Sequence, residues 1–220
     1  MDKIFSIPDT KRLKYIAIYG IVATVAFTVI YGFCNSMATT AVTRYSLYTD
    51  WELDIPLIPW MIYPYLSLNL LFLISAFVIK DVSAIKGYCL GIVAGALAAG
   101  VIFYFFPGNL GFVRQEVPGY ESIYRAMFEI DQPHNLFPSL HITYSSISIW
   151  TMIEQTRNKV FHFILWLWLI LISMSVVFVH QHHLFDIVSG YILAIIVFKL
   201  VVTRYHPTVF KPHSFFSKNL

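Results

Sequence analysis

The sequence contains few charged residues and very little cysteine, and each shortage narrows the class of protein. Of 220 residues, 12% are charged and 58% are hydrophobic, and the mean hydropathy is +0.68. Soluble domains of this size carry about 25% charged residues, so the composition excludes an ordinary soluble domain and favours a polytopic membrane protein. The net charge of +3 is too small to indicate a nucleic-acid partner.

The two cysteines, Cys34 and Cys89, match no metal-binding spacing. We place them near opposite ends of their helices, about 30 Å apart in depth across a bilayer. A disulfide needs Cα atoms within about 7 Å, so none is predicted. We expect no bound metal and no cofactor.

Six apolar stretches are long enough to cross a membrane, which takes about 17 to 25 residues in a helix. We therefore expect an all-α protein with six transmembrane helices in one domain, residues 1–220. The fourth stretch is rich in serine and threonine and should face other helices or a polar cavity. The expected spans are 15–33, 59–79, 85–106, 138–154, 160–179 and 184–202.

The basic residues predict the orientation of these spans. If the N-terminus is cytoplasmic, 12 of the 15 lysines and arginines lie inside, and only Arg44, Arg114 and Arg125 lie outside. This asymmetry follows the positive-inside rule, and it places both termini in the cytoplasm. We expect a multi-pass protein of a bacterial inner membrane, with its site facing the periplasm or the outside.

Two outer loops are longer than simple connections need to be. The loop 35–58 should contain a short interfacial helix. The loop 107–137 has 31 residues, many of them apolar or aromatic. Loops of this length are usually functional or disordered, and the apolar content predicts an ordered cap lying against the membrane.

Two histidine-containing motifs border the fourth and sixth spans. The first is Phe137-Pro138-Ser139-Leu140-His141, and the second is Gln181-His182-His183-x-x-Asp186. The 41 residues between His141 and His182 fit one helix down through the bilayer, a turn and one helix back. Both motifs should therefore reach the outer face, where they would form a candidate active site.

These residue types suit transfer of a phosphoryl group. A carboxylate four residues after His182 lies on the same helix face and can hold the imidazole in one tautomer, which makes His182 a candidate nucleophile. His141 can donate a proton to a leaving alkoxide. Ser139 at a helix start and Arg114 are candidate phosphate ligands, because free backbone N–H groups and guanidinium bind phosphate oxygens.

The same motifs resemble the second and third signatures of the type 2 phosphatidic acid phosphatase superfamily, Pro-Ser-Gly-His and Ser-Arg-x5-His-x3-Asp. The strings from Asp131 to His141, Gln181 to Asp186 and Asp54 to Tyr65 resemble the branch that contains inositol phosphorylceramide synthases and related bacterial membrane phosphatases. The resemblance implies a phosphohistidine at His182, oriented by Asp186, with His141 as general acid and Ser139 binding phosphate.

Two departures from the signatures reduce the positive charge expected around the phosphate. The arginine of the third signature falls at Val176, and the first signature, Lys-x6-Arg-Pro, survives only as Phe106-Pro107-x6-Arg114. We assign Arg114 to phosphate binding. We expect His180, His183 or Asn135 to compensate in part for the missing positive charge. His183 and Asn135 are therefore included among the candidate substrate-binding residues.

The function predicted is removal of phosphate from a membrane lipid, at the outer face, without a metal. Transfer of a phospho-headgroup to a lipid alcohol stays open as an alternative. So do a metal-dependent hydrolase, because His141, His180, His182, His183 and Asp186 are all possible ligands, and a non-enzymatic lipid transporter. The expected partners are a lipid substrate and the bilayer, and the pattern specifies no oligomeric state.

Overall fold

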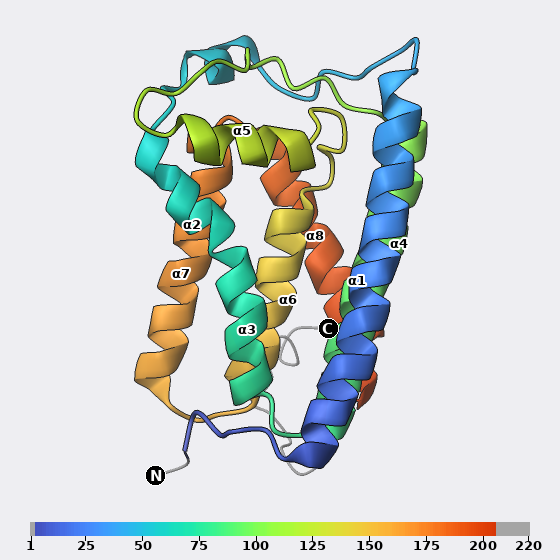
Figure 1. The fold of residues 1–220 in the computed structure, drawn as a ribbon, viewed down its shortest axis with the longest axis vertical. Coiled ribbons are helices and arrows are strands. Elements are labelled where there is room, and N and C mark those ends of the chain that lie inside the picture. Colours follow the sequence, from blue (N-terminus) through green and yellow to red (C-terminus); the bar gives the residue numbers. More distant parts are fainter. Residues whose placement is uncertain (1–2, 206–220) are drawn as a thin grey trace, which may run out of the picture.

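The computed structural model describes residues 3–205, which form an all-α bundle (Figure 1). The predicted all-α class is confirmed. Five segments are long and apolar enough to cross a membrane, which indicates an integral multi-pass protein. They are Thr10–Thr39, Pro59–Val78, Val82–Phe105, Lys159–Phe178 and Leu184–Tyr205. The C-terminal tail predicted to be cytoplasmic lies largely outside the described residues.

The long helices are α1 (Thr10–Thr39), α4 (Val82–Phe105), α7 (Lys159–Phe178) and α8 (Leu184–Leu200), which η3 (Val202–Tyr205) follows. The second span is built from three pieces, η2 (Pro59–Met61), α2 (Ile62–Leu66) and α3 (Leu68–Val78). The pieces join at Ser67, whose hydroxyl donates to the Pro64 carbonyl at 2.5 Å and accepts from the Trp168 indole at 2.8 Å. These two bonds tie the break in the span to α7.

The fourth expected span corresponds to α6 (Leu140–Glu154), which has 15 residues and is about 22 Å long. It is shorter than a membrane-spanning helix usually is. It runs through the centre of the bundle and packs against α3, α4, α7 and α8 (Figure 1). The buried, non-helical chain before it takes the place of another turn, which is tolerated at membrane depth where protein surrounds it.

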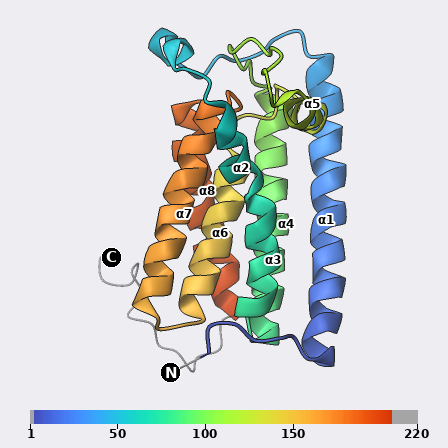
Figure 2. The same cartoon turned by 60° about the vertical axis from the view of Figure 1, so that its left-hand side comes forward.

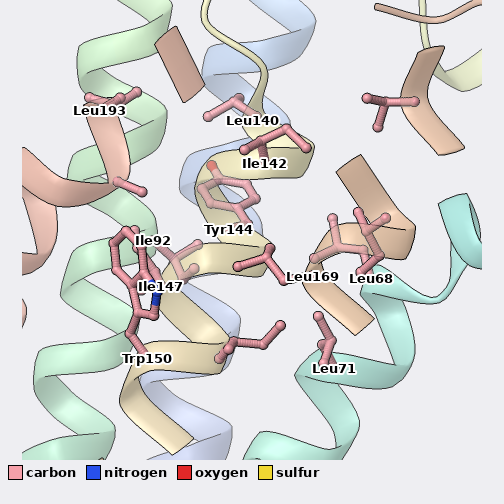
Figure 3. Packing of buried hydrophobic residues seen from close by; sticks show 14 of the residues in the cluster. Leu68, Leu71, Ile92, Leu140, Ile142, Tyr144, Ile147, Trp150, Leu169 and Leu193 are labelled. Carbon is pink, nitrogen blue, oxygen red and sulfur yellow. The ribbon is translucent and has the colours of Figure 1, made fainter. Parts of the chain in front are cut away.

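The polar residues of α6 are buried against neighbouring helices, as the serine and threonine content predicted. The Ser148 hydroxyl donates to the Tyr144 carbonyl at 2.7 Å and pairs with the Tyr88 hydroxyl of α4 at 2.9 Å. Around these contacts, Tyr144 and Ile147 pack against apolar side chains of the surrounding helices (Figure 3). The helix α6 is therefore the core of the bundle. Its first turn lies at the end of the bundle that carries the loops 35–58 and 107–137.

The helix α1 packs along α4, and it stands apart from the other long helices (Figure 2). Close approach needs a residue without a side chain, since a Cβ on Gly100 of α4 would lie 2.4 Å from Ile30 of α1. On its other side, α1 faces α3 across a cavity, which is described with the site below.

The two outer loops form an ordered cap, as expected. The loop 107–137 contains α5 (Glu121–Ile130), which lies across the end of the bundle (Figure 1). The loop 35–58 contains the short helix η1 (Asp50–Asp54), although α1 extends to Thr39 and takes the first residues of that loop. Beneath the cap, the start of α6 and the connection between α7 and α8 lie at the same end of the molecule.

Candidate active site

The connection between α7 and α8 is a tight turn that positions His182. The backbone N–H groups of Gln181 and His182 both donate to the Val176 carbonyl, at 3.0 Å each. This closure requires a left-handed residue, which is His180 with φ of 56°. A residue other than glycine is rarely held there, and the ring of His180 is fixed by a 2.8 Å contact from Nε2 to the Ile55 carbonyl.

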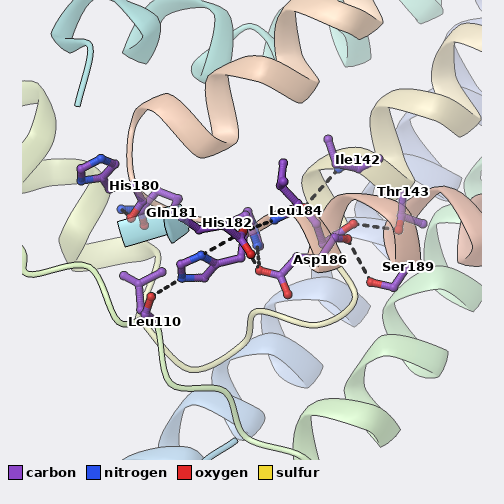
Figure 4. A network of polar contacts seen from close by, with 12 residues as sticks. Leu110, Ile142, Thr143, His180, Gln181, His182, Leu184, Asp186 and Ser189 are labelled. Carbon is purple, nitrogen blue, oxygen red and sulfur yellow. Dashed lines mark hydrogen bonds and ion pairs between the residues drawn. The ribbon is translucent and has the colours of Figure 1, made fainter. Parts of the chain in front are cut away.

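Asp186 in the first turn of α8 holds the His182 ring. Its Oδ2 lies 3.2 Å from His182 Nδ1 and accepts the backbone N–H of His183 at 2.9 Å (Figure 4). A carboxylate only accepts hydrogen bonds, so in the neutral ring Nδ1 carries the proton and Nε2 has the lone pair. Both side chains are buried, with 6% of His182 and 2% of Asp186 exposed. This is the tautomer that a nucleophilic histidine requires.

The structure brings His141 to this pair from the start of α6. The Ser139 N–H donates to the Asp186 carbonyl at 3.1 Å, which locks the beginning of α6 to α8. As a result, the ring centroids of His141 and His182 are 6.2 Å apart. Reacting groups meet at about 3–3.5 Å, so one phosphorus centre between the rings would contact both.

Tyr65 contacts His141 and links it to Asp131, an arrangement that the motifs alone do not identify. The Tyr65 ring stacks on His141 with centroids 4.1 Å apart, and its hydroxyl donates to Asp131 Oδ2 at 2.5 Å. The Tyr31 hydroxyl donates to the other carboxylate oxygen at 3.3 Å. The sequence gives a hint of this group, since Asp131 and Tyr65 each lie within a string that carries the family resemblance.

Arg114 reaches the site from the cap. Its guanidinium donates to the carbonyls of Phe128, at 3.0 Å, and Asp131, and to the Gln181 side chain at 3.2 Å. These acceptors are uncharged, so the positive charge stays available beside Gln181 and His182. Burial lowers the pKa of Arg114, and the nearby Asp131 carboxylate opposes this change; a guanidinium remains protonated in either case.

The other two arginines predicted on the outer face make no hydrogen bond or ion pair with His141 or His182. Arg44 donates to the Ala38 and Thr39 carbonyls at the end of α1, at 3.1 Å each. Arg125 is exposed and lies 3.7 Å from Glu116. Of the three arginines predicted on the outer face, Arg114 alone hydrogen-bonds a residue next in sequence to the candidate nucleophile, Gln181.

His183 points away from His182, into the cap. Its ring stacks on Tyr48 and Phe112, its Nε2 contacts the Leu110 carbonyl, and its Nδ1 lies 3.4 Å from Glu52. Glu52 also accepts the Leu184 N–H at 2.9 Å. Burial alone would raise the pKa of Glu52, but hydrogen bonds from Leu184 and Thr49 outweigh it and lower the pKa. These contacts attach the cap to the start of α8.

A cavity of about 560 Å³ lies below the two histidines, between α1, α3, α4 and α6. The end of the cavity nearest the cap is lined by His141, His182, Asn135, Asp131 and Gln181. The Asn135 amide donates to the Tyr31 carbonyl at 3.1 Å, while its buried Oδ1 has no partner among residues 3–205. The remaining predicted site residues do not line the cavity; they are Arg114, Ser139, His183 and Asp186.

Ser139 is fully buried, and its hydroxyl accepts the Ile142 N–H at 3.5 Å as the N-cap of α6. The histidines that a metal site would need are dispersed, because His180 and His183 contact the Ile55 and Leu110 carbonyls. Over the described part of the chain, no three His, Cys, Asp or Glu side chains are grouped as metal ligands would be.

A His–Asp pair facing a second histidine, at one end of an apolar bundle and above a cavity, defines a polytopic membrane protein with a candidate phosphoryl-transfer site. Comparison with protein families identifies the class. The chain belongs to the PAP2 superfamily, whose profile matches residues 58–200. Membership implies phosphatase or phosphotransferase activity on lipid phosphates in general. The predicted superfamily is confirmed, whereas the branch within it stays a prediction. No curated protein matches the chain.

Proposed function

We propose that this protein is a metal-independent lipid phosphatase that acts through a phosphohistidine on His182. The observation that carries the proposal is the 3.2 Å contact between His182 Nδ1 and Asp186, with the His141 ring on the cavity side of the same pair. The family gives the general reaction type, and these three side chains supply a nucleophile, an orienting carboxylate and a general acid.

In the first step, Nε2 of His182 attacks phosphorus and the bond from phosphorus to the lipid oxygen breaks. Protonated His141 gives its proton to the departing alkoxide, and the product is a lipid alcohol. Asp186 stabilises the positive charge that forms on the His182 ring. Arg114, whose hydrogen bonds all go to uncharged groups, offsets the charge of the phosphoryl oxygens.

In the second step, water attacks the phosphohistidine. Neutral His141 takes a proton from that water, the bond from phosphorus to Nε2 breaks, and inorganic phosphate leaves. His141 is then protonated and His182 neutral, as at the start. Transfer to a lipid alcohol uses the same steps with an alcohol in place of water. Asp131 favours this second candidate. Its carboxylate lines the cavity near His141 and can accept a hydrogen bond from the hydroxyl of the attacking lipid alcohol.

The proposal includes six spans and a site on the outer face. The helix α6, fourth in chain order, is added to the five long apolar segments. The count of six is supported by α6, which packs against α3, α4, α7 and α8 in the centre of the bundle. The outer location is supported by the distribution of lysine and arginine, which leaves three arginines at the site end.

The proposed function is tested with purified protein, a panel of lipid phosphates and lipid alcohols, and simultaneous measurement of free phosphate and new phospholipid. Phosphate release with water alone supports hydrolysis, and new phospholipid formed only with an added alcohol supports transfer. Activity that EDTA abolishes and zinc restores would overturn the metal-independent mechanism in favour of the metal-dependent alternative. Absence of both products from every substrate would contradict both candidate reactions.

A further inference from the structure

The cavity below His141 continues far into the bundle. On α1 its lining runs from Tyr31 beside the site to Ile16, and on the second span it runs from Tyr65 to Ile79. At 1.5 Å per helical residue these are depths of about 22 Å and about 21 Å. Two helices on opposite sides thus give the same depth. We call this part of the cavity the shaft.

The depth of the shaft exceeds one leaflet. The hydrocarbon core of a bilayer is about 30 Å thick, so a leaflet contributes about 15 Å. With the site at the outer face, the inner end of the shaft, near Ile16 and Ile85, lies beyond the midplane. The lining below the site is apolar, apart from Thr24, Asn69, Ser75 and the hydroxyls of Tyr88 and Tyr144.

The volume of the shaft fits one chain. A water-sized group takes up about 30 Å³, so the cavity of about 560 Å³ holds about nineteen such groups. Carbon–carbon bonds of about 1.52 Å advance an extended chain by about 1.25 Å per carbon, so about 17 carbons reach the bottom. The volume is therefore enough for one extended chain of this length.

The shaft also opens sideways. Thr24 of α1 and Asn69 of α3 both line it and are both exposed, so the space between these two helices is continuous with the surroundings of the bundle. In a membrane, those surroundings are lipid. A chain can therefore pass into the shaft from the bilayer while its phosphate moves to His182.

We propose that the shaft measures the substrate chain: a single extended chain of about 17 carbons, attached to the phosphate, fills it from His141 to Ile16. The inference rests on the proposed function, because it takes the phosphate at His182 as its starting point. It names the substrate class as lipid phosphates that have at least one chain longer than a leaflet of the bilayer is deep.

Gly20 provides the test. It lines the shaft about 16 Å below Tyr31, and a Cβ built on it meets no atom within 4 Å. Leucine at this position should fill the lower part and leave room for about 13 carbons. Gly32 is the matched control, since it is on the same helix, has nothing within 4 Å of its Cβ and does not line the shaft.

Phosphate release is measured for straight-chain alkyl monophosphates of 8 to 20 carbons in detergent, for the full-length protein, Gly20→Leu and Gly32→Leu. In the unmodified protein and Gly32→Leu, kcat/KM should rise up to about 17 carbons and then level off. In Gly20→Leu the rise should end at about 13, with equal activity on the shortest chains.

Each outcome has a separate meaning. Release that is independent of chain length, or a Gly20→Leu profile equal to that of the unmodified protein, overturns the shaft as a measure of the chain and leaves the proposed function intact. An equal loss in both leucine variants assigns the effect to α1 packing and also overturns it. No release from any substrate by the unmodified protein contradicts the proposed function itself. The melting temperatures of the three proteins are measured as a control, to check that all are folded.

Discussion

Tyr65 stacks on the His141 ring with centroids 4.1 Å apart, and the same side chain donates its hydroxyl to Asp131 at 2.5 Å. His141, the proposed general acid, is therefore packed against a residue whose hydroxyl donates to a carboxylate. Among residues 3–205, no protein group hydrogen-bonds the His141 nitrogens, which leaves them for the substrate. Asp131 holds the Tyr65 ring in this position through the hydrogen bond from the Tyr65 hydroxyl.

Asp131→Asn should slow alkyl phosphates at least tenfold more than 4-nitrophenyl phosphate. The reason is that loss of the carboxylate that holds Tyr65 against the His141 ring should impair proton donation, and an aryl oxide leaves without a proton. His141→Ala should show the same selectivity to a greater degree. Tyr31→Phe is the control, because it removes a contact to Asp131 without touching His141. An equal loss on both substrates would assign Asp131 to folding or binding instead.

His182→Ala should abolish turnover together with any acid-labile phosphoenzyme. Asp186→Asn should reduce the rate strongly, because the amide no longer enforces the Nδ1–H tautomer; in serine proteases the equivalent change costs about 10⁴-fold. The phosphoenzyme is measured by acid quench after brief incubation with labelled substrate. His180→Ala should retain phosphoenzyme formation. If His180→Ala lost it while His182→Ala kept it, the nucleophile would be assigned to the wrong histidine.

Arg114→Ala should reduce turnover by on the order of a hundredfold, the scale of removing one pre-organised donor. Arg114→Lys should recover only part, because lysine lacks the two-pronged donor geometry. Arg44→Ala and Arg125→Ala should be mild, since neither side chain hydrogen-bonds or pairs with His141 or His182. Steady-state kinetics of the four variants checks this. A larger loss from Arg125→Ala would place the phosphate ligand on α5.

Glu52 makes the attachment of the cap dependent on pH. Its pKa lies below the ordinary value, so the folded state favours the ionised carboxylate and the stabilisation is complete above about pH 4.3, the value in an unfolded chain. It is lost as the pH falls through the lower folded-state pKa. Glu52→Gln should therefore melt several degrees lower at pH 7, and the difference should close below about pH 4.3. A gap that widened in acid would contradict this sign.

The orientation can be tested with cysteines at two exposed positions. Gln115→Cys in the cap should react with an impermeant thiol reagent added to intact cells, and Lys159→Cys at the start of α7 should react only after the membrane is opened. The native cysteines, Cys34 and Cys89, are both buried, so the unmodified protein is the background control. The reverse labelling pattern would place the candidate site in the cytoplasm.

The sequence by itself determined those features of the fold and of the candidate site that depend on local residue spacing. Apolar length predicted five of the spans to within a few residues at most ends, because a helix crosses lipid only with about 20 apolar residues. The four-residue spacing of His182 and Asp186 predicted their contact, although His182 lies in the turn before α8 and not within the helix. The superfamily followed from the same motifs.

The tertiary structure alone decided what depends on residues far apart in the chain. His183 follows the candidate nucleophile directly, yet Glu52, 131 positions earlier, and Phe112 hold it in the cap. Asp131 meets His141 only through Tyr65, which lies 66 positions from Asp131 on a different helix. The shaft exists because α1 packs on α4 and remains apart from α3. Helix periodicity specifies which residues share a face, whereas the packing of whole helices specifies which faces meet and where they leave space.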